Sequence, residues 1–287
     1  MRAPAALALP AFLVAVSSSP SAAADPSPEL TYLPEIDLPI TVVGGASWIA
    51  SELAKKGLAP ASCRWCEANA LDTSIRDELV WRDNPNTAHD VSNVMVLGVA
   101  PAAALGLTAL AAWYDGRSDN IAADLVIVTE AMVVAMDLNQ ITKYIVGRQR
   151  PYSHYDNLDV LRAGEGASGP VPNDDDLSFF SGHSTAVFSL AAASGTVASM
   201  RGYRAAPWVW ANGMALAALS GYLRIAGDRH YFTDVLTGAV FGAASGVLIP
   251  ALFHAPRPGV AGPGTPRFRV SLAPAGGGAG VGVAGAF

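Results

Sequence analysis

The sequence predicts an all-α fold, a helical bundle embedded in a membrane, with a short β-like hairpin at its C-terminus. Hydrophobic residues make up 51% of the 287 residues and charged residues only 15%, against ~25% charged in a typical soluble domain. The mean hydropathy of +0.32 is high for a soluble enzyme and low for a protein that lies almost wholly in lipid. Apolar segments of helical length, separated by polar turns, complete the evidence.

Residues 1–24 resemble a secretory signal peptide. Arg2 supplies a minimal positive region, residues 5–16 form a short apolar region, and Ala22-Ala23-Ala24 offers a cleavage site before Asp25. The alternative is an uncleaved anchor helix, but this apolar region is short of the ~20 residues needed to span a membrane. We therefore expect cleavage and export.

Residues 25–90 are predicted to form an external N-terminal segment. Its Pro-rich part, 25–38, is expected to be an extended lead-in. Residues 40–54 are apolar and end at Lys55-Lys56-Gly57, a helix stop. They are short for a membrane span, so we expect an interfacial or partly buried helix. Residues 60–90 are polar, as expected of a segment packed outside the bundle.

The two cysteines, Cys63 and Cys66, form a C-x-x-C pattern. In an oxidising compartment the simplest interpretation is a local disulfide that closes a tight loop. A redox motif would be expected beside a βαβ pattern, which the sequence does not suggest, and a zinc site would need two further ligands at suitable spacing. Free thiols are the remaining alternative.

Residues 91–254 are predicted to be the helical core. Residues 91–114 contain no charged residue and, at ~1.5 Å per residue, exceed the ~30 Å hydrocarbon core of a bilayer. Pro101 lies inside this segment and is expected to kink it. The helices predicted after this segment are rich in Gly, Ala and Ser, which suits close packing between membrane helices. These helices are predicted over residues 121–146, 181–200, 207–223 and 233–254, with a long polar loop at 152–179.

Residues 255–287 are predicted to be a linker and a C-terminal tail. Residues 255–266 are rich in Pro and Gly, and residues 267–273 alternate weakly between apolar and polar. The glycines of 276–280 can turn this segment into a second short strand that ends at Phe287. A surface hairpin is preferred over an outer-membrane strand, because one hairpin cannot form a barrel.

Charge gives an expected topology. If the signal is cleaved, the N-terminus is outside and residues 40–54 do not span, five crossings follow. The basic turns at 115–120 and 201–204 then lie inside with the tail, in agreement with the positive-inside rule. Six crossings after a cleaved signal would invert this arrangement, so five are preferred. The net charge of −6 argues against a nucleic-acid partner.

Three polar motifs stand at the ends of predicted helices, and their cations suit a tetrahedral oxyanion. Lys143, Arg150 and Arg224 can offset a phosphate dianion and stabilise the added charge of a five-coordinate transition state. Ser181 and Gly182 stand at a helix start, where free N–H groups favour an anion and glycine permits close approach. No metal or other cofactor is required if these groups carry the charge. The motifs are Lys143-Tyr-Ile-Val-Gly-Arg-Gln-Arg150-Pro151, Phe180-Ser181-Gly182-His183 and Arg224-Ile-Ala-Gly-Asp-Arg-His230-Tyr-Phe-Thr-Asp234.

The same motifs supply groups for phosphoryl transfer. His230 and Asp234 are four residues apart and share a helix face if the helix begins by that point. A carboxylate on one imidazole nitrogen fixes the tautomer and leaves the other nitrogen free to attack. His183, from another helix, can protonate the leaving oxygen. Each motif alone is typical of an ordinary helix end, but together, on one predicted face, they indicate a phosphohistidine intermediate.

The combined pattern K-x6-R-P, S-G-H and R-x5-H-x3-D resembles the type 2 phosphatidic acid phosphatase (PAP2) superfamily, which also includes bacterial non-specific acid phosphatases and vanadium haloperoxidases. The resemblance covers about residues 90–254 and implies an all-helical catalytic core with a metal-independent phosphatase site. The site residues it implies are Lys143, Arg150, Arg224, Ser181 and Gly182 for phosphate binding, His183 as acid, His230 as nucleophile and Asp234 as its partner.

Two positions depart from the family pattern. Phe180 replaces the usual proline before Ser-Gly-His, and Leu223 replaces the usual serine before Arg224. Neither carries reacting atoms. With Phe179, Phe180 is expected to add apolar surface at the mouth of the site, which would suit a lipid tail.

The remaining polar groups allow simpler interpretations. Glu130 and Asp137 lie seven apart on one predicted membrane helix. Such groups are functional candidates, but a buried hydrogen-bonded pair that braces helices is the simpler view. The acidic run 174–176 is expected to be a solvated loop, and His89 and His254 are expected to be structural.

The preferred function is an integral membrane phosphatase that acts on a lipid phosphate or diphosphate at the periplasmic face of a bacterial inner membrane. Phosphatidate, phosphatidylglycerol phosphate and polyprenyl diphosphate are candidate substrates. The alternatives are a secreted soluble acid phosphatase of the periplasm, a vanadate-dependent haloperoxidase and a non-enzymatic protein that binds phosphorylated lipid. His230, Asp234 and His183 together argue against the last of these.

Overall fold

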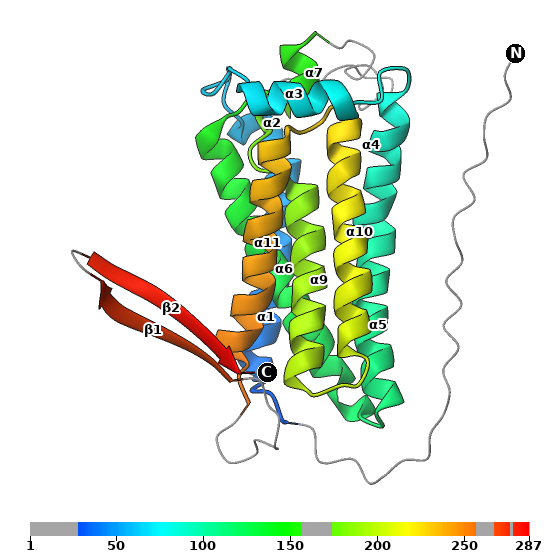
Figure 1. Ribbon diagram of the computed structural model, residues 1–287, viewed down its shortest axis with the longest axis vertical. Helices are drawn as coiled ribbons and strands as arrows, with labels where there is room; N and C mark the ends of the chain where they lie inside the picture. Colours follow the sequence, from blue (N-terminus) through cyan, green and yellow to red (C-terminus); the bar gives the residue numbers. More distant parts are fainter. Residues whose placement is uncertain (1–27, 157–173, 257–266, 276–277, 287) are drawn as a thin grey trace, which may run out of the picture.

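The computed structural model describes residues 28–156, 174–256, 267–275 and 278–286. Its long helices run side by side along one axis (Figure 1), so the predicted all-α fold is confirmed. The predicted signal peptide at residues 1–24 and most of the linker lie outside the described residues. The bundle consists of α1 (Pro34–Leu53), α4 (Pro85–Val94) with its continuation α5 (Ala100–Tyr114), α6 (Ile121–Val146), α9 (Gly182–Met200), α10 (Ala206–Ala226) and α11 (Phe232–Phe253).

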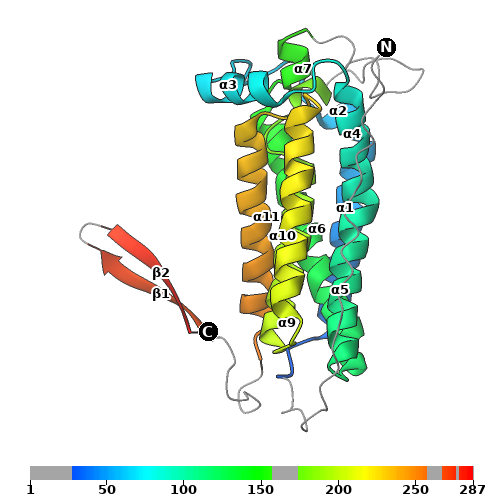
Figure 2. The same ribbon diagram turned by 45° about the vertical axis from the view of Figure 1, so that its right-hand side comes forward.

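Short elements gather at one end of the bundle. The helix α3 (Ala70–Leu79) lies across that end, beside α2 (Lys55–Leu58) and α7 (Pro151–His154) (Figures 1 and 2). Two 3₁₀ turns complete the described helical elements, η2 (Ser118–Asn120) before α6 and η4 (Asp174–Asp176) before α9. The end that α3 covers is called the capped end below, and the other is called the open end.

The helix predicted to begin at Val91 begins earlier, at Pro85. Asn84 caps it, because its side chain accepts a hydrogen bond from the Thr87 N–H at 3.2 Å. Proline is favoured at the first helical position, where its missing N–H costs nothing. The helix therefore enters the segment predicted to lie outside. The disturbance expected at Pro101 takes the form of a π turn, η1 (Met95–Val99), immediately before α5.

The first helix is longer than predicted, and this changes the topology. Residues 34–53 form α1, whereas the sequence suggested an extended lead-in up to residue 38. Asp37 permits the early start, because its carboxylate accepts the Leu33 N–H at 2.8 Å. The helix runs along α6, where the Ser47 hydroxyl donates to Asp137 at 2.7 Å. Residues 40–54, expected to be an interfacial or partly buried helix, therefore belong to a longer helix that runs along the bundle (Figure 1).

Because α1 traverses the bundle, both ends of the helical part of the chain meet at the open end. Leu30 and Pro256 form an isolated antiparallel bridge there, and the Thr31 hydroxyl donates to the carbonyl oxygen of Ala255 at 2.8 Å. The helical chain therefore starts and finishes at the end opposite α3. In the bundle, α1 adds one long helix to the five segments on which the expected topology was built.

Glycines bring α11 against the central helix α9. A Cβ atom added at Gly238 would lie 2.6 Å from the carbonyl oxygen of Ser181, and Gly242 and Gly246 face the carbonyl oxygens of Thr185 and Ser189 in the same way. Spaced four apart, these glycines form a small-residue stripe that permits close contact between backbones. The predicted tight packing of these helices is therefore observed.

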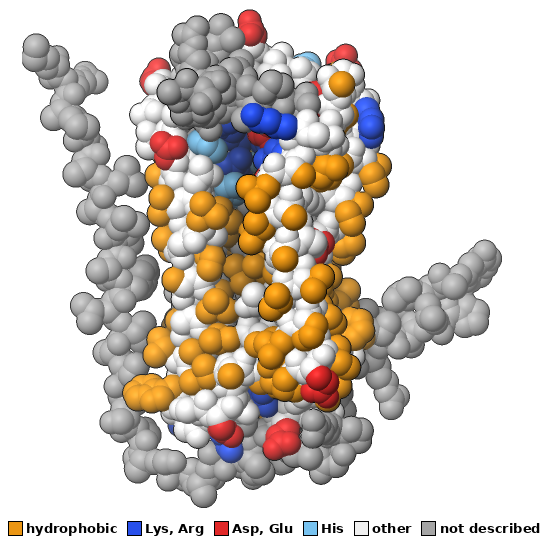
Figure 3. All heavy atoms as spheres, turned by 180° about the vertical axis from the view of Figure 1, so that it is seen from behind, with side chains coloured by type: hydrophobic (Ala, Val, Ile, Leu, Met, Phe, Trp, Pro, Cys, Tyr) orange, Lys and Arg blue, Asp and Glu red, His pale blue; other side chains and the backbone are white. Residues whose placement is uncertain are grey.

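The face of the bundle opposite to that of Figure 1 carries hydrophobic side chains over most of its length (Figure 3). Two helices, Pro85–Tyr114 and Phe232–Phe253, are long and apolar enough to cross a membrane. Large hydrophobic side chains point outward from several helices, as in a protein surrounded by lipid. They include Val42, Val43, Leu97, Trp113, Val240 and Phe253.

The C-terminal hairpin is present. The strands β1 (Arg267–Ala275) and β2 (Gly278–Ala286) pair antiparallel, with Arg267 opposite Ala286 and Ala275 opposite Gly278. They form a separate two-stranded sheet outside the bundle (Figure 1).

The glycine stripe yields a stability prediction. The substitution Gly242→Leu should lower the free energy of unfolding by about 2 kcal/mol or more, because a side chain there must displace the backbone of α9. Ala244→Leu on the exposed side of α11 is the matched control and should be tolerated. Thermal unfolding in detergent measures both, and equal melting temperatures for the two variants would contradict the packing described.

Candidate active site

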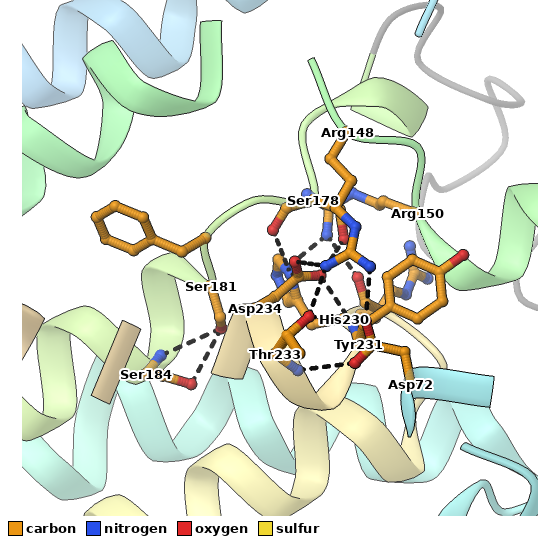
Figure 4. Close-up of polar contacts among 12 residues, drawn as sticks. Asp72, Arg148, Arg150, Ser178, Ser181, Ser184, His230, Tyr231, Thr233 and Asp234 are labelled. Atoms are coloured by element: carbon orange, nitrogen blue, oxygen red, sulfur yellow. Dashed lines mark hydrogen bonds and ion pairs between the residues drawn. The ribbon is translucent and has the colours of Figure 1, made fainter. Parts of the chain in front are cut away.

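The three polar motifs meet at the capped end of the bundle (Figure 4). The first follows α6, the second begins α9, and the third joins α10 to α11. The structure therefore brings the three motifs together at one end of the bundle. The segment that precedes them in sequence also contributes, because α3 packs over the junction of α10 and α11.

His230 is buried and held in one tautomer. Its Nδ1 lies 2.8 Å from the carbonyl oxygen of Ser178, and a carbonyl oxygen can only accept a hydrogen bond. Its Nε2 lies 3.2 Å from Nη1 of Arg150, and a guanidinium group can only donate. The proton is therefore on Nδ1, and the lone pair of Nε2 faces the cation. This is the tautomer that a nucleophile requires.

The partner of His230 differs from the prediction. The carboxylate of Asp234 lies 3.7 Å from Nδ1, too far for a hydrogen bond, and the carbonyl of Ser178 takes that place. The Asp234 carboxylate instead accepts from the Ser178 hydroxyl at 2.6 Å and from the Tyr231 N–H at 2.9 Å. Asp234 thus holds Ser178, which contacts the His230 ring, and Tyr231, which follows His230 in the chain. It therefore acts on His230 indirectly.

Arg148 is the largest group that the sequence argument missed. Its guanidinium bridges two buried carboxylates, Asp234 at 2.6 Å and Asp72 at 2.7 Å, and lies between the rings of Trp65 and Tyr231. Only 1% of Arg148 is exposed. It belongs to the first motif, Gly147-Arg148-Gln149-Arg150, and the presence of a second arginine there was the available signal.

Asp72 connects α3 to this network. Its carboxylate accepts from the N–H of Thr233 at 2.9 Å and from the Thr233 hydroxyl at 2.7 Å. Thr233 lies in the first turn of α11, between His230 and Asp234. The segment predicted to pack outside the core therefore supplies a buried carboxylate to the site.

Arg150 contacts His230, the predicted nucleophile, through Nη1 at 3.2 Å. Its Nη1 also donates to the carbonyl oxygen of Arg229 at 3.0 Å, and its Nε donates to that of Asp174 at 2.9 Å. The Asp174 carboxylate lies 3.3 Å from Arg150 and 3.2 Å from Lys55. The acidic run 174–176 is thus packed against the first motif, which corrects the expectation of a solvated loop. Burial alone would raise the pKa of Asp174, but these two cations lower it below its ordinary value.

Lys143 and Gly182, both predicted to bind phosphate, lie close together. A Cβ atom added at Gly182 would lie 3.3 Å from Nζ of Lys143 and 3.1 Å from Oδ1 of Asn139. Ser181 caps α9, and its hydroxyl oxygen accepts the Ser184 N–H at 3.3 Å. Asn139 donates to the carbonyl oxygen of Phe180 at 2.8 Å and so positions this turn.

His183 and Arg224 are linked through α4. Nε2 of His183 lies 2.8 Å from Oδ1 of Asn93, and Nδ2 of Asn93 lies 3.2 Å from Nε2 of His89. Arg224 lies 3.0 Å from Nδ1 of His89 and donates to the Ser92 hydroxyl at 2.9 Å. His89 and Asn93, to which the sequence argument gave no part in the site, therefore orient the predicted acid and one predicted phosphate ligand.

Phe180 does not lie at the mouth of the site. It is 2% exposed and stacks on Phe241 of α11 with ring centroids 5.0 Å apart. Phe179 contacts Trp65 instead, with centroids 5.4 Å apart. The apolar pair therefore anchors the turn before α9, and the expectation that Phe180 offers surface to a lipid tail is wrong.

Cys63 and Cys66 form a disulfide in the structure. The loop that it closes is tied to the first motif, because the N–H of Arg64 donates to the carbonyl oxygen of Gly147 at 2.9 Å. The N–H of Gln149 donates in return to the carbonyl oxygen of Trp65 at 3.0 Å. The disulfide loop therefore lies at the capped end and supports the loop segment that carries Arg148.

The electrostatics favour a neutral imidazole at His230. Burial, followed by the positive charges of Arg150 and Arg224, lowers the pKa of His230 well below its ordinary value of 6.5. The imidazole is therefore unprotonated at neutral pH. The arrangement can hold an anion between a neutral imidazole and several fixed cations.

Residues 124–258 match the model of the PAP2 superfamily. They include all three motifs and, among the site residues named above, Arg148, Lys143 and Asp234. The match supports a phosphatase and agrees with the resemblance drawn from the motifs.

One solved structure is similar in fold, the crystal structure described as the first transmembrane PAP2 type phosphatidylglycerolphosphate phosphatase from Bacillus subtilis. The identity is 16% and the TM-score 0.46, over 75% of this chain and 96% of that one. No curated protein matches the chain at a significant level.

The network around Arg148 makes a testable prediction. Asp72→Ala should lower kcat by about tenfold to a hundredfold, because one hydrogen bond to a charged group contributes about 1.5–3 kcal/mol. Asp77→Ala on the exposed side of α3, which contacts Arg82, is the matched control and should leave kcat unchanged. Steady-state phosphate release by both variants measures the effect. Equal rates would remove Asp72 from the account.

Proposed function

We propose that the chain is a lipid phosphatase that works through a phosphohistidine intermediate. The observation that carries this proposal is the orientation of His230, whose Nε2 lone pair faces Arg150 at 3.2 Å while Nδ1 is engaged by the Ser178 carbonyl. A fixed lone pair aimed at a cation is a suitable arrangement for attack on a bound phosphate.

The reaction follows from the positions of the groups. Lys143, Arg150 and Arg224 bind the phosphate oxygens, with the N–H groups at the start of α9. Nε2 of His230 attacks phosphorus as the bond to the lipid oxygen breaks, and His183 gives that oxygen a proton. A water molecule then attacks the phosphohistidine, His183 takes its proton, and phosphate and neutral His230 are released. Every charge that develops on phosphate oxygen has a fixed cation beside it, so the proposed chemistry requires no metal or cofactor.

The surface around the site supports a lipid substrate. Seen from the side opposite to Figure 1, a hollow near the capped end is lined by Lys or Arg and His side chains and is bordered below by hydrophobic side chains (Figure 3). A phosphate group in the hollow would leave its apolar tail beside that belt. A soluble phosphate ester would make no use of this border.

We further propose that the capped end faces the periplasm of a bacterium from its inner membrane. The support is the Cys63–Cys66 disulfide at this end, because disulfides persist in oxidising compartments. The distribution of basic residues is a weaker guide to the orientation. The positive-inside rule expects Lys and Arg on the cytoplasmic side, but Lys55, Lys56 and Arg82 lie near the capped end.

This orientation bears on the N-terminus. The helical chain starts and ends at the open end, so a periplasmic site requires Leu30 and Pro256 on the cytoplasmic side. A cleaved secretory signal would place residue 25 in the periplasm instead. The proposed orientation therefore replaces the signal-peptide interpretation of residues 1–24.

The chemistry is tested by phosphate release from phosphatidate in detergent with excess EDTA. The wild-type protein should release phosphate, and His230→Ala should lose nearly all of this activity, at least about a thousandfold, because the attacking atom is gone. His154→Ala is the matched control, since the His154 ring packs against Tyr155 and the variant keeps the main-chain hydrogen bond from residue 154 to the carbonyl oxygen of Arg150. Undiminished release by His230→Ala would contradict the mechanism. Release by the wild-type protein from a short soluble ester but from no lipid phosphate or diphosphate would contradict the substrate class.

The orientation is tested by reporter fusions. Alkaline phosphatase, which folds only in the periplasm, should be inactive when fused after residue 256 and active when inserted in the disulfide loop region near residue 60. Green fluorescent protein after residue 256 should fluoresce. The reverse pattern would place the site in the cytoplasm.

A further inference from the structure

A second cluster of ionisable groups lies near the open end of the bundle, apart from the phosphate site. It consists of Asp37 in the first turn of α1, Glu130 in α6 and His254 just after α11. Their exposed fractions are 7%, 5% and 1%. One donor atom from each residue lies within 4.8 Å of the others.

The imidazole of His254 has its second nitrogen free. Nδ1 lies 2.9 Å from the carbonyl oxygen of Thr31, so Nδ1 donates and the lone pair is on Nε2. That nitrogen is buried and has no hydrogen-bond partner among the described residues, and the same is true of Oε2 of Glu130. The two side chains face each other, with Nε2 3.7 Å from Oε1 of Glu130.

These two unpartnered atoms are costly unless something binds them. A buried polar group without a partner costs about 1–3 kcal/mol, and a buried charge costs more. Glu130 and Asp37 form no ion pair with a lysine or arginine of the described residues. Two buried carboxylates therefore face one imidazole, and a divalent cation between them would balance the charge.

The arrangement matches that of a metal ligand set. Metal-binding histidines commonly donate their other ring N–H to a backbone carbonyl, which fixes the tautomer, as Thr31 does here. Donor atoms on one tetrahedral Zn²⁺ lie ~3.4 Å apart, from bond lengths of ~2.0–2.2 Å. The 3.7 Å between Nε2 of His254 and Oε1 of Glu130 is close to this spacing. Asp37 completes the group, because one oxygen of its carboxylate lies within 4.8 Å of a ligand atom of each of the other two residues.

We propose that Asp37, Glu130 and His254 bind a divalent transition-metal ion of the Zn²⁺ class, which joins α1, α6 and α11 at the open end. One nitrogen and two carboxylate ligands suit zinc or cobalt, and further positions would be completed by water. The role is structural, because the catalytic His230 lies at the opposite end of the bundle. The alternative is a protonated His254 held between the carboxylates without a metal.

Zinc binding by the chelator-treated protein tests this proposal. The wild-type chain should bind one Zn²⁺ in equilibrium dialysis, and its melting temperature should rise by about 5 °C or more at a hundredfold excess over Kd. His254→Gln and Glu130→Gln should abolish both effects. Asp137→Asn, seven residues further along α6 and bound to Ser47, is the control and should retain both.

A spectroscopic readout keeps the test independent of folding and activity. Co²⁺ bound by one nitrogen and several oxygens should give visible absorption bands in the wild-type and Asp137→Asn proteins, and none in His254→Gln. A wild-type chain that takes up neither Zn²⁺ nor Co²⁺ would overturn the proposal and leave the protonated histidine. Uptake that survives in both His254→Gln and Glu130→Gln would overturn it as well.

Discussion

An arginine taken out of water needs a partner, and this chain buries several of them at one end of a helical bundle. Arg148 answers the requirement with two carboxylates and two aromatic rings, and so joins the end of α6 to α3 and to α11. The Arg150 guanidinium is paired with backbone carbonyl oxygens and with the Asp174 carboxylate. These contacts fix the loops that carry the site, and they leave Nε2 of His230 facing a cation.

The fold was largely predictable because hydrophobic length determines it. The helix 121–146 was predicted with its observed bounds, α9 differs from its prediction by one residue at its start, and α11 by one residue at each end. The errors fell where polar residues begin a helix. Asp37 and Pro85 each favour an earlier helix start, which hydropathy averaged along a segment does not reveal. The early start of α1 added one helix to the bundle.

The site was predictable to the extent that each residue reacts or binds anion directly. The motifs identified His230, His183 and the cations, since their chemistry depends on residue type and short spacing. Asp72, Asn93 and the carbonyl of Ser178 were missed because they act through tertiary contacts across 52 to 161 residues of sequence. The direct pairing of Asp234 with His230 was wrong for the same reason, since Arg148 and Ser178 compete for its carboxylate.

The central claim is that a buried cation cluster and the Ser178 carbonyl keep His230 neutral, with its proton on Nδ1. The direct measurement is ¹⁵N NMR of histidine-labelled protein in detergent at pH 7, with His230→Asn used to assign the signals. The account predicts that His230 gives one protonated Nδ1 signal and one unprotonated Nε2 signal. An imidazolium, or a proton on Nε2, would contradict it.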